Sequence, residues 1–152
     1  MLGLIAAAAI HVVPVPPVSP AREPGLAQAP AEAAAVVDRF HDALRRGDGK
    51  AALVLLADDA VIYESGMAEL SKVEYEAAHL AADIEYSGAV KEIVTRRSGG
   101  GGGAKTAWVL SEGRTSGTFQ ERKINRSTTE TMILSPTARG WKITHIHWSS
   151  GK

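Results

Sequence analysis

The chain has 152 residues, of which 45% are hydrophobic and 22% charged, and its 17 basic and 17 acidic residues cancel to a formal net charge of zero. This length suits one domain, and the charge balance has none of the basic excess typical of proteins that bind nucleic-acid phosphates. The absence of cysteine excludes disulfides, thiolate metal sites and a cysteine nucleophile.

The first 30 residues differ in composition from the rest of the chain. Residues 2–13 are apolar except for Gly3 and His11, and five prolines follow between residues 14 and 24. The apolar run has the length of a signal-peptide core and is too short to span a bilayer, while the prolines prevent a helix or strand. We therefore exclude residues 1–30 from the fold. We expect them to direct export to the periplasm or beyond, with a disordered leader of a cytoplasmic protein as the alternative.

Three helices are predicted at the start of the domain, which covers residues 31–152. Apolar residues recur at helical spacing over 31–46, and Gly47 ends that helix. The segment 48–56 opens on an aspartate that can cap a second helix. The segment 71–85 opens on a Ser-x-x-Glu capping box and predicts the third.

The rest of the domain has the short alternating runs typical of strands. Strands are predicted at residues 60–64, 90–97, 106–112, 118–124, 127–134 and 141–150, with a flexible glycine-rich connection at 98–104 and turns at 113–117 and 135–140. Helices at the front and strands behind predict an α+β fold, in which the helices cover one face of a curved antiparallel sheet. Such a sheet, with the helices on its concave face, encloses a cone-shaped cavity.

Several stretches of the chain resemble the nuclear transport factor 2-like superfamily, and most of all its SnoaL-like group of unassigned function. The matching stretches are Phe40-His41-Asp42-Ala43-Leu44 with Gly47-Asp48, residues 55–66, Tyr75, residues 79–83, Ala107-Trp108-Val109, Thr129-Glu130-Thr131-Met132 and residues 140–150. The superfamily includes ketosteroid isomerases, polyketide cyclases and the association domain of calmodulin-dependent kinase, so the resemblance implies a fold more firmly than an activity. The Tyr/Asp arrangement of ketosteroid isomerase is not recognisable here, so steroid activity is not carried over.

The last strand carries the main candidate site residues. Alternation puts Trp141, Ile143, His145, His147 and Ser149 on one face, which the resemblance implies is the cavity face. The Cα atoms of the two histidines would lie about 6.6 Å apart, a spacing that suits an acid/base pair or a His-x-His metal pair. Both could equally be hydrogen-bonded residues that shape the cavity.

Other elements supply further candidates for the cavity. Glu64 shares a strand face with Ile62 and could pair with a histidine, and His79 lies on the inward stripe of its helix. Glu130 needs a partner if it is buried, and His145 or His147 is the expected one. Trp108 and Met132 are expected to form apolar wall and Ser149 to contact a ligand.

These residues predict a pocket for a small, mostly apolar organic molecule. If the protein is an enzyme, we expect cofactor-free isomerisation, dehydration or cyclisation, with His145, His147, Glu64 and His79 as the acid/base groups. A non-catalytic module that binds a ligand or dimerises is the alternative, and a His/Glu metal site a further one. On the opposite face of the last strand, Ile146 and Trp148 predict a homodimer through the convex side of the sheet.

Overall fold

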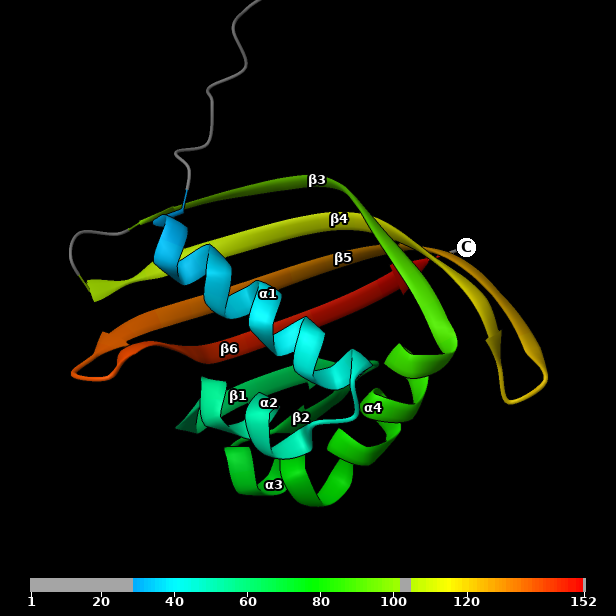
Figure 1. Cartoon of the computed structure of the whole chain (residues 1–152), viewed down its shortest axis with the longest axis horizontal. Coiled ribbons are helices and arrows are strands. Elements are labelled where there is room, and N and C mark those ends of the chain that lie inside the picture. Colours follow the sequence, from blue (N-terminus) through cyan, green and yellow to red (C-terminus); the bar gives the residue numbers. More distant parts are fainter. Residues whose placement is uncertain (1–28, 102–104, 152) are drawn as a thin grey trace, which may run out of the picture.

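The computed structural model describes residues 29–101 and 105–151. These residues form four helices and six strands, and an arched sheet lies over the helices (Figure 1). The elements are α1 Ala31–Arg45, α2 Gly49–Leu55, β1 Leu56–Glu64, β2 Met67–Glu69, α3 Lys72–Ala78, α4 Leu80–Ala89, β3 Val90–Gly101, β4 Ala107–Phe119, β5 Arg122–Thr137 and β6 Gly140–Gly151. The predicted α+β class with a curved sheet is confirmed. Residues 1–28 lie outside the described part, so the leader and its export stay predictions.

The helices begin and end where the sequence places their caps. Gly47 adopts a positive φ of 73° just after α1, a conformation that glycine adopts without strain. The carboxylate of Asp48 accepts a hydrogen bond from Ala51 N at 3.0 Å. Ser71 Oγ accepts from Glu74 N at 3.2 Å, while the Glu74 carboxylate accepts from Leu70 N at 2.8 Å. The predicted third helix is in fact two, α3 and α4, which meet at His79.

The sheet has the order β2-β1-β6-β5-β4-β3 and is mixed, because β1 and β6 run parallel while the other neighbours are antiparallel. Helix α1 crosses the concave face of the long strands (Figure 1). Its Val36, Val37, Phe40 and Leu44 are buried against Val109, Met132 and Ile146 of the sheet in one apolar core. The helices therefore lie on the concave face, as predicted.

The predicted turn at 113–117 and the separate strand at 118–124 are wrong. Strand β4 runs without interruption from Ala107 to Phe119, and the hairpin turns at Gln120 and Glu121. Both turn residues have positive φ, 46° and 64°, the conformation of a two-residue type I′ turn that usually carries asparagine or glycine. Gly113 lies inside the strand. The position requires glycine because a Cβ there would lie 2.9 Å from Ile93 O.

The predicted glycine-rich connection is partly strand, since β3 continues to Gly101. Gly100 pairs with Trp108 of β4, and a Cβ at Gly100 would lie 2.5 Å from the indole ring. The glycines thus make room for a tryptophan beside the edge strand.

A β-bulge in β6 reverses the side-chain alternation on which the site prediction rested. Ile143 pairs with Leu134 and His145 with Ile133, so β6 has one extra residue, Thr144, between consecutive pairs. A bulge of this kind shifts the following side chains to the opposite face. Ile143 and Ile146 are consequently both fully buried.

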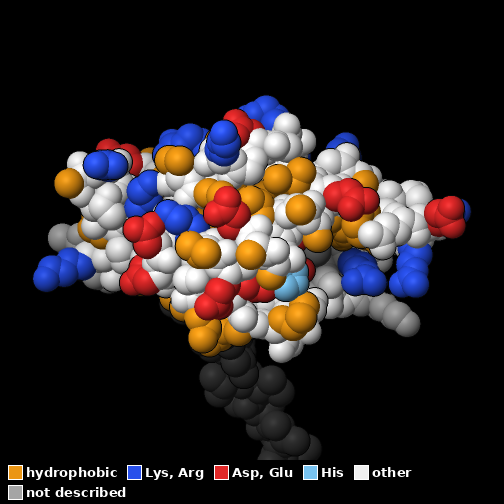
Figure 2. Space-filling model, turned by 90° about the horizontal axis from the view of Figure 1, so that it is seen from below, with side chains coloured by type: hydrophobic (Ala, Val, Ile, Leu, Met, Phe, Trp, Pro, Cys, Tyr) orange, Lys and Arg blue, Asp and Glu red, His pale blue; other side chains and the backbone are white. Residues whose placement is uncertain are grey.

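Exposed apolar side chains concentrate on the short helices and β2. Val54, Met67, Leu70 and Val73 are between 53% and 68% exposed. Figure 2 looks at the molecule from this side and shows hydrophobic side chains among acidic ones. Within residues 29–101 and 105–151, no helix combines the length and the hydropathy that a membrane crossing requires.

Candidate functional site

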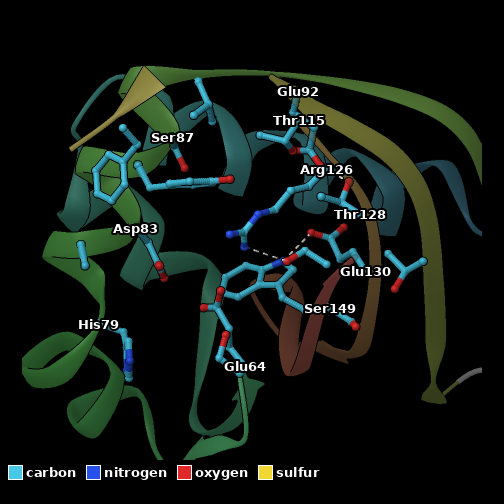
Figure 3. Close-up of a pocket in the computed structure, with 18 of the residues that line it drawn as sticks. Glu64, His79, Asp83, Ser87, Glu92, Thr115, Arg126, Thr128, Glu130 and Ser149 are labelled. Carbon is cyan, nitrogen blue, oxygen red and sulfur yellow. Dashed lines mark hydrogen bonds between the residues drawn. The ribbon is translucent and has the colours of Figure 1, made fainter. Parts of the chain in front are cut away.

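A cavity of about 600 Å³ opens on the concave side of the sheet. Helices α1 and α4, the end of β1 and the inner faces of β3 to β6 contribute its walls (Figure 3). Its acidic, basic and histidine lining residues are His41, Arg45, Glu64, His79, Asp83, Glu92, Arg126, Glu130 and His147. This volume is within the range of small-molecule sites.

One wall holds a buried carboxylate with two partners. Glu130 of β5 is 8% exposed, and its Oε2 lies 2.7 Å from His41 Nε2 of α1. The same oxygen accepts a hydrogen bond from Trp148 Nε1 of β6 at 2.8 Å. Trp148 in turn stacks on Phe40 of α1, with the ring centroids 6.3 Å apart. The group ties the first helix to the two central strands.

The two partners hold each other in their charged forms. Burial lowers the pKa of His41, but the hydrogen bond and charge of Glu130 outweigh burial and raise it above the ordinary 6.5. Burial raises the pKa of Glu130, but the hydrogen bond and charge of His41 leave it below 4.5. The interaction between the two side chains therefore favours the ion pair. The second oxygen of Glu130, Oε1, is buried and has no hydrogen-bond partner among the described residues.

A second group of carboxyls lies at the other end of the cavity. Glu64 ends β1, and Asp83 of α4 accepts a hydrogen bond from the hydroxyl of the buried Tyr75 at 2.8 Å. Burial, followed by the charge of Asp83, raises the pKa of Glu64. Burial also raises the pKa of Asp83, in spite of the hydrogen bond from Tyr75. Burial and the same carboxylate raise the pKa of Tyr75, so Tyr75 stays a donor. Both carboxyls are thus displaced toward the neutral range in which proton transfer is efficient.

His79 caps α4 beside this group. Its Nδ1 lies against the carboxylate of Glu69, which is 5% exposed, without meeting the geometry of a hydrogen bond. The residue lies at the junction of α3 and α4 and lines the cavity from there. Figure 3 shows His79, Glu64 and Asp83 together on one side.

Five of the predicted site residues line the cavity: Glu64, His79, Glu130, His147 and Ser149. The prediction that His145 or His147 pairs with Glu130 was wrong, because the partner of Glu130 is His41 of α1. Met132 is fully buried in the core. Trp108 is not among the lining residues and packs beside Gly100.

The orientation predicted for the last strand is wrong beyond its bulge. Trp148 and Ile146 face the helices, so His145, His147 and Ser149 alternate onto the convex face. The rings of His145 and His147 lie against Tyr63 of β1, with centroid separations of 5.4 and 6.5 Å. His145 Nδ1 also lies 2.9 Å from Val61 O. His147 and Ser149 nevertheless line the cavity at this end of the strand, together with Trp148. For the same reason Ile146 and Trp148 are not part of a convex contact surface.

Sequence reasoning missed His41, Asp83 and Arg126 as site residues. His41 follows Val37 at helical spacing, so its place on the buried side of α1 could have been inferred. Asp83 lies eight positions after Tyr75, across a helix break that the sequence did not reveal. Arg126 lies on a strand whose register depends on the unforeseen hairpin at Gln120 and Glu121.

The metal alternative receives no support from the geometry. Among residues 29–101 and 105–151, no three His, Asp or Glu side chains converge closely enough to hold an ion. The His145 and His147 pair that motivated the idea stands against Tyr63.

The fold and the sequence both have known relatives. No curated protein matches the chain. A provisionally named ketosteroid isomerase of Shewanella frigidimarina is 34% identical, with a TM-score of 0.75, over 78% of this chain and 95% of its own. The calcium/calmodulin-dependent protein kinase II hub of S. rosetta is 18% identical, with a TM-score of 0.68, over 89% of this chain and 99% of its own. A nuclear transport factor 2-like protein of unknown function from Pseudomonas putida is 18% identical, with a TM-score of 0.65, over 78% and 84%.

At 18% identity the last two structures share the fold alone. The family model of the SnoaL-like domain, however, matches residues 33–151, from the first turn of α1 to the end of β6. The chain therefore belongs to the SnoaL-like domain family.

Proposed function

We propose that this domain binds a small organic molecule in its cavity and moves a proton on it without a cofactor, with Glu64 as the base. The observation that carries the proposal is the pair of cavity carboxyls, Glu64 and Asp83, whose pKa values are both raised by burial. A carboxylate of raised pKa is a stronger base than one in water.

The surroundings of Glu64 suit the abstraction and return of a proton. Glu64 would take a proton from a carbon next to a carbonyl group and give it back at another position of the same molecule. The C–H bond broken at the first position is replaced by one formed at the second, and the double bond shifts between them. Asp83, held by Tyr75, favours the protonated form of Glu64 through its charge. The provisional name of the S. frigidimarina relative is consistent with this class of reaction.

The test is the conversion of a β,γ-unsaturated cyclic ketone to its conjugated isomer, followed by ultraviolet absorbance. We expect Glu64→Gln to slow turnover by about 10²- to 10⁴-fold, which is the usual contribution of a general base. The rate of the unsubstituted protein should fall as the pH drops through the raised pKa of Glu64, because only the ionised carboxylate accepts a proton.

Glu76→Gln is the matched control, because Glu76 is exposed on α3 and is not among the residues that line the cavity. Its rate should equal that of the unsubstituted protein. Equal losses in both variants, or no loss in Glu64→Gln, would remove Glu64 from the reaction.

A second role, in oligomer assembly, has its own support. Association and hub domains of kinases share this fold, and the convex face of the sheet carries Tyr63, His145 and the partly buried Leu110 and Ile133. We propose that copies of this chain pair through that face.

Sedimentation velocity of the full chain should show a species larger than a monomer. Ile133→Asp should shift it toward the monomer, since a charge on this face would be desolvated on pairing. Glu76→Lys on the exposed side of α3 is the control and should sediment as the unsubstituted chain does. A monomer at all protein concentrations would rule out the assembly.

A further inference from the structure

Arg126 of β5 brings a cation into the cavity, and no carboxylate of the described residues forms an ion pair with it. Its guanidinium reaches toward the middle of the cavity (Figure 3). Within the described chain, its one protein hydrogen bond runs from Nη1 to Ser150 Oγ and is 3.5 Å long. Most of the five N–H groups of the guanidinium therefore have no protein acceptor.

Three other cationic side chains, His41 and Arg45 of the cavity lining and Arg97 of β3, differ in this respect. Arg45 pairs with Asp42, Arg97 with Asp38, and His41 with Glu130. In each case a carboxylate from the same helix or a facing element neutralises the positive charge. Arg126 lacks such a carboxylate although Glu92 and Glu64 line the same cavity, so its fork of donors is open to a bound molecule.

Aromatic rings line the same cavity as the guanidinium. Tyr86 of α4 and Phe119 of β4 both line the cavity and contact edge to face, with ring centroids 5.2 Å apart. Burial raises the pKa of the Tyr86 hydroxyl, and the positive charge of Arg126 opposes that rise. Trp148 contributes a further ring to the lining.

We propose that the ligand of this cavity is a small aromatic or alicyclic carboxylate, held by Arg126 through its carboxylate group and by Tyr86 and Phe119 through its ring. The proposal rests on the proposed function and narrows its substrate class. A guanidinium presents two parallel N–H groups that match the two oxygens of a carboxylate, and such pairs are stronger than neutral hydrogen bonds. The ring faces supply the apolar contact that the carboxylate alone would lack.

The carboxyl groups of the cavity are compatible with an anionic ligand. Glu130 is neutralised by His41, and burial raises the pKa of both Glu64 and Asp83. An anion bound near them would raise those pKa values further. Binding should therefore tighten as the pH falls while the ligand stays ionised, whereas turnover should fall over the same range because Glu64 acts as a base only when it is ionised.

The experiment compares three probes that share a phenyl ring, namely benzoate, acetophenone and benzylamine, by ¹H–¹⁵N NMR titration of the full chain. Benzoate is expected to bind about 10- to 100-fold more tightly than acetophenone, from the usual worth of a hydrogen bond to a charged group. Arg126→Gln should weaken benzoate by the same factor and leave acetophenone unchanged.

Arg114→Gln is the matched control. Arg114 is an exposed residue of β4, on the face of the hairpin that points away from the cavity, and its Nε donates to Asn125 Oδ1. Replacing it with glutamine removes the same charge as Arg126→Gln does. Benzoate affinity should not change in this variant.

Tighter binding of benzylamine than of benzoate, or equal weakening of benzoate in both variants, would overturn the carboxylate assignment. Acetophenone shifting residues around Glu64 and Tyr86 in that event would leave the proposed function standing. No shift of cavity residues with any probe would contradict both.

Discussion

Replacing His41 with leucine is expected to lower the free energy of unfolding by about 3 kcal/mol near pH 6, the usual loss when one partner of a buried ion pair is removed. Glu130 is 8% exposed and keeps only Trp148 as a partner in this variant. Its Oε1 is already without a hydrogen bond. The remaining carboxylate is therefore charged, buried and poorly compensated, which costs more than the loss of the histidine contacts themselves.

The pH dependence of stability identifies the pair as the cause. The folded pKa of His41 lies above 6.5, so its contribution is complete below pH 6.5 and is lost as the pH rises through the raised value. The folded pKa of Glu130 lies below 4.5, so its contribution is present above pH 4.5 and is lost as the pH falls through the lowered value. The pair stabilises the fold most between these limits.

His41→Leu should abolish the alkaline loss and reverse the acid one, because an unpaired buried carboxyl is more stable when protonated. Urea denaturation at a series of pH values measures both effects. The double variant His41→Leu with Glu130→Met is the control and should recover most of the stability, since apolar side chains can replace a buried pair. A double variant no more stable than His41→Leu would show that leucine is simply a poor fit on α1.

The sequence predicted those parts of the fold that depend on local signals. The caps at Asp48 and Ser71 and the apolar stripe of α1 are written within a few residues of the elements they define. Glu64 could be assigned to the cavity because β1 alternates regularly beside it.

The parts that failed depend on contacts between distant residues. At the bulge around Thr144, the pairing of β6 with both β1 and β5 shifts its register. The residues next to Thr144 include no glycine or proline that would have predicted the bulge. The hairpin at Gln120 and Glu121 uses residues that rarely adopt positive φ, while Gly113 lies in a strand because of its neighbour across the sheet. The ion pair of Glu130 with α1 joins elements nearly ninety positions apart (residues 41 and 130), so a partner on the adjacent strand seemed more natural.

Trp148 gives the sharpest test of the corrected orientation of β6. Trp148→Ala should lower the free energy of unfolding by about 3 kcal/mol, because it leaves a cavity against Phe40 and removes a donor from Glu130. His147→Ala, one position earlier, should change stability by less than about 0.5 kcal/mol, as is usual for an exposed side chain. Uninterrupted alternation from Trp141 would predict the opposite order.

Trp148→Phe separates the two parts of the effect, since phenylalanine keeps a ring on Phe40 but has no N–H for Glu130. We expect a loss of about 1.5 kcal/mol, the lower end for a hydrogen bond to a charged group. Urea unfolding followed by far-ultraviolet circular dichroism, with unchanged slopes, measures all three variants on one scale. Because the hydrogen bond acts on ionised Glu130, the Trp148→Phe deficit should shrink as the pH falls through the lowered pKa of that residue. A deficit that stays constant down to that pH would mean that the indole N–H does not stabilise the ionised carboxylate of Glu130. The ring contact with Phe40 alone would then fix β6 against α1.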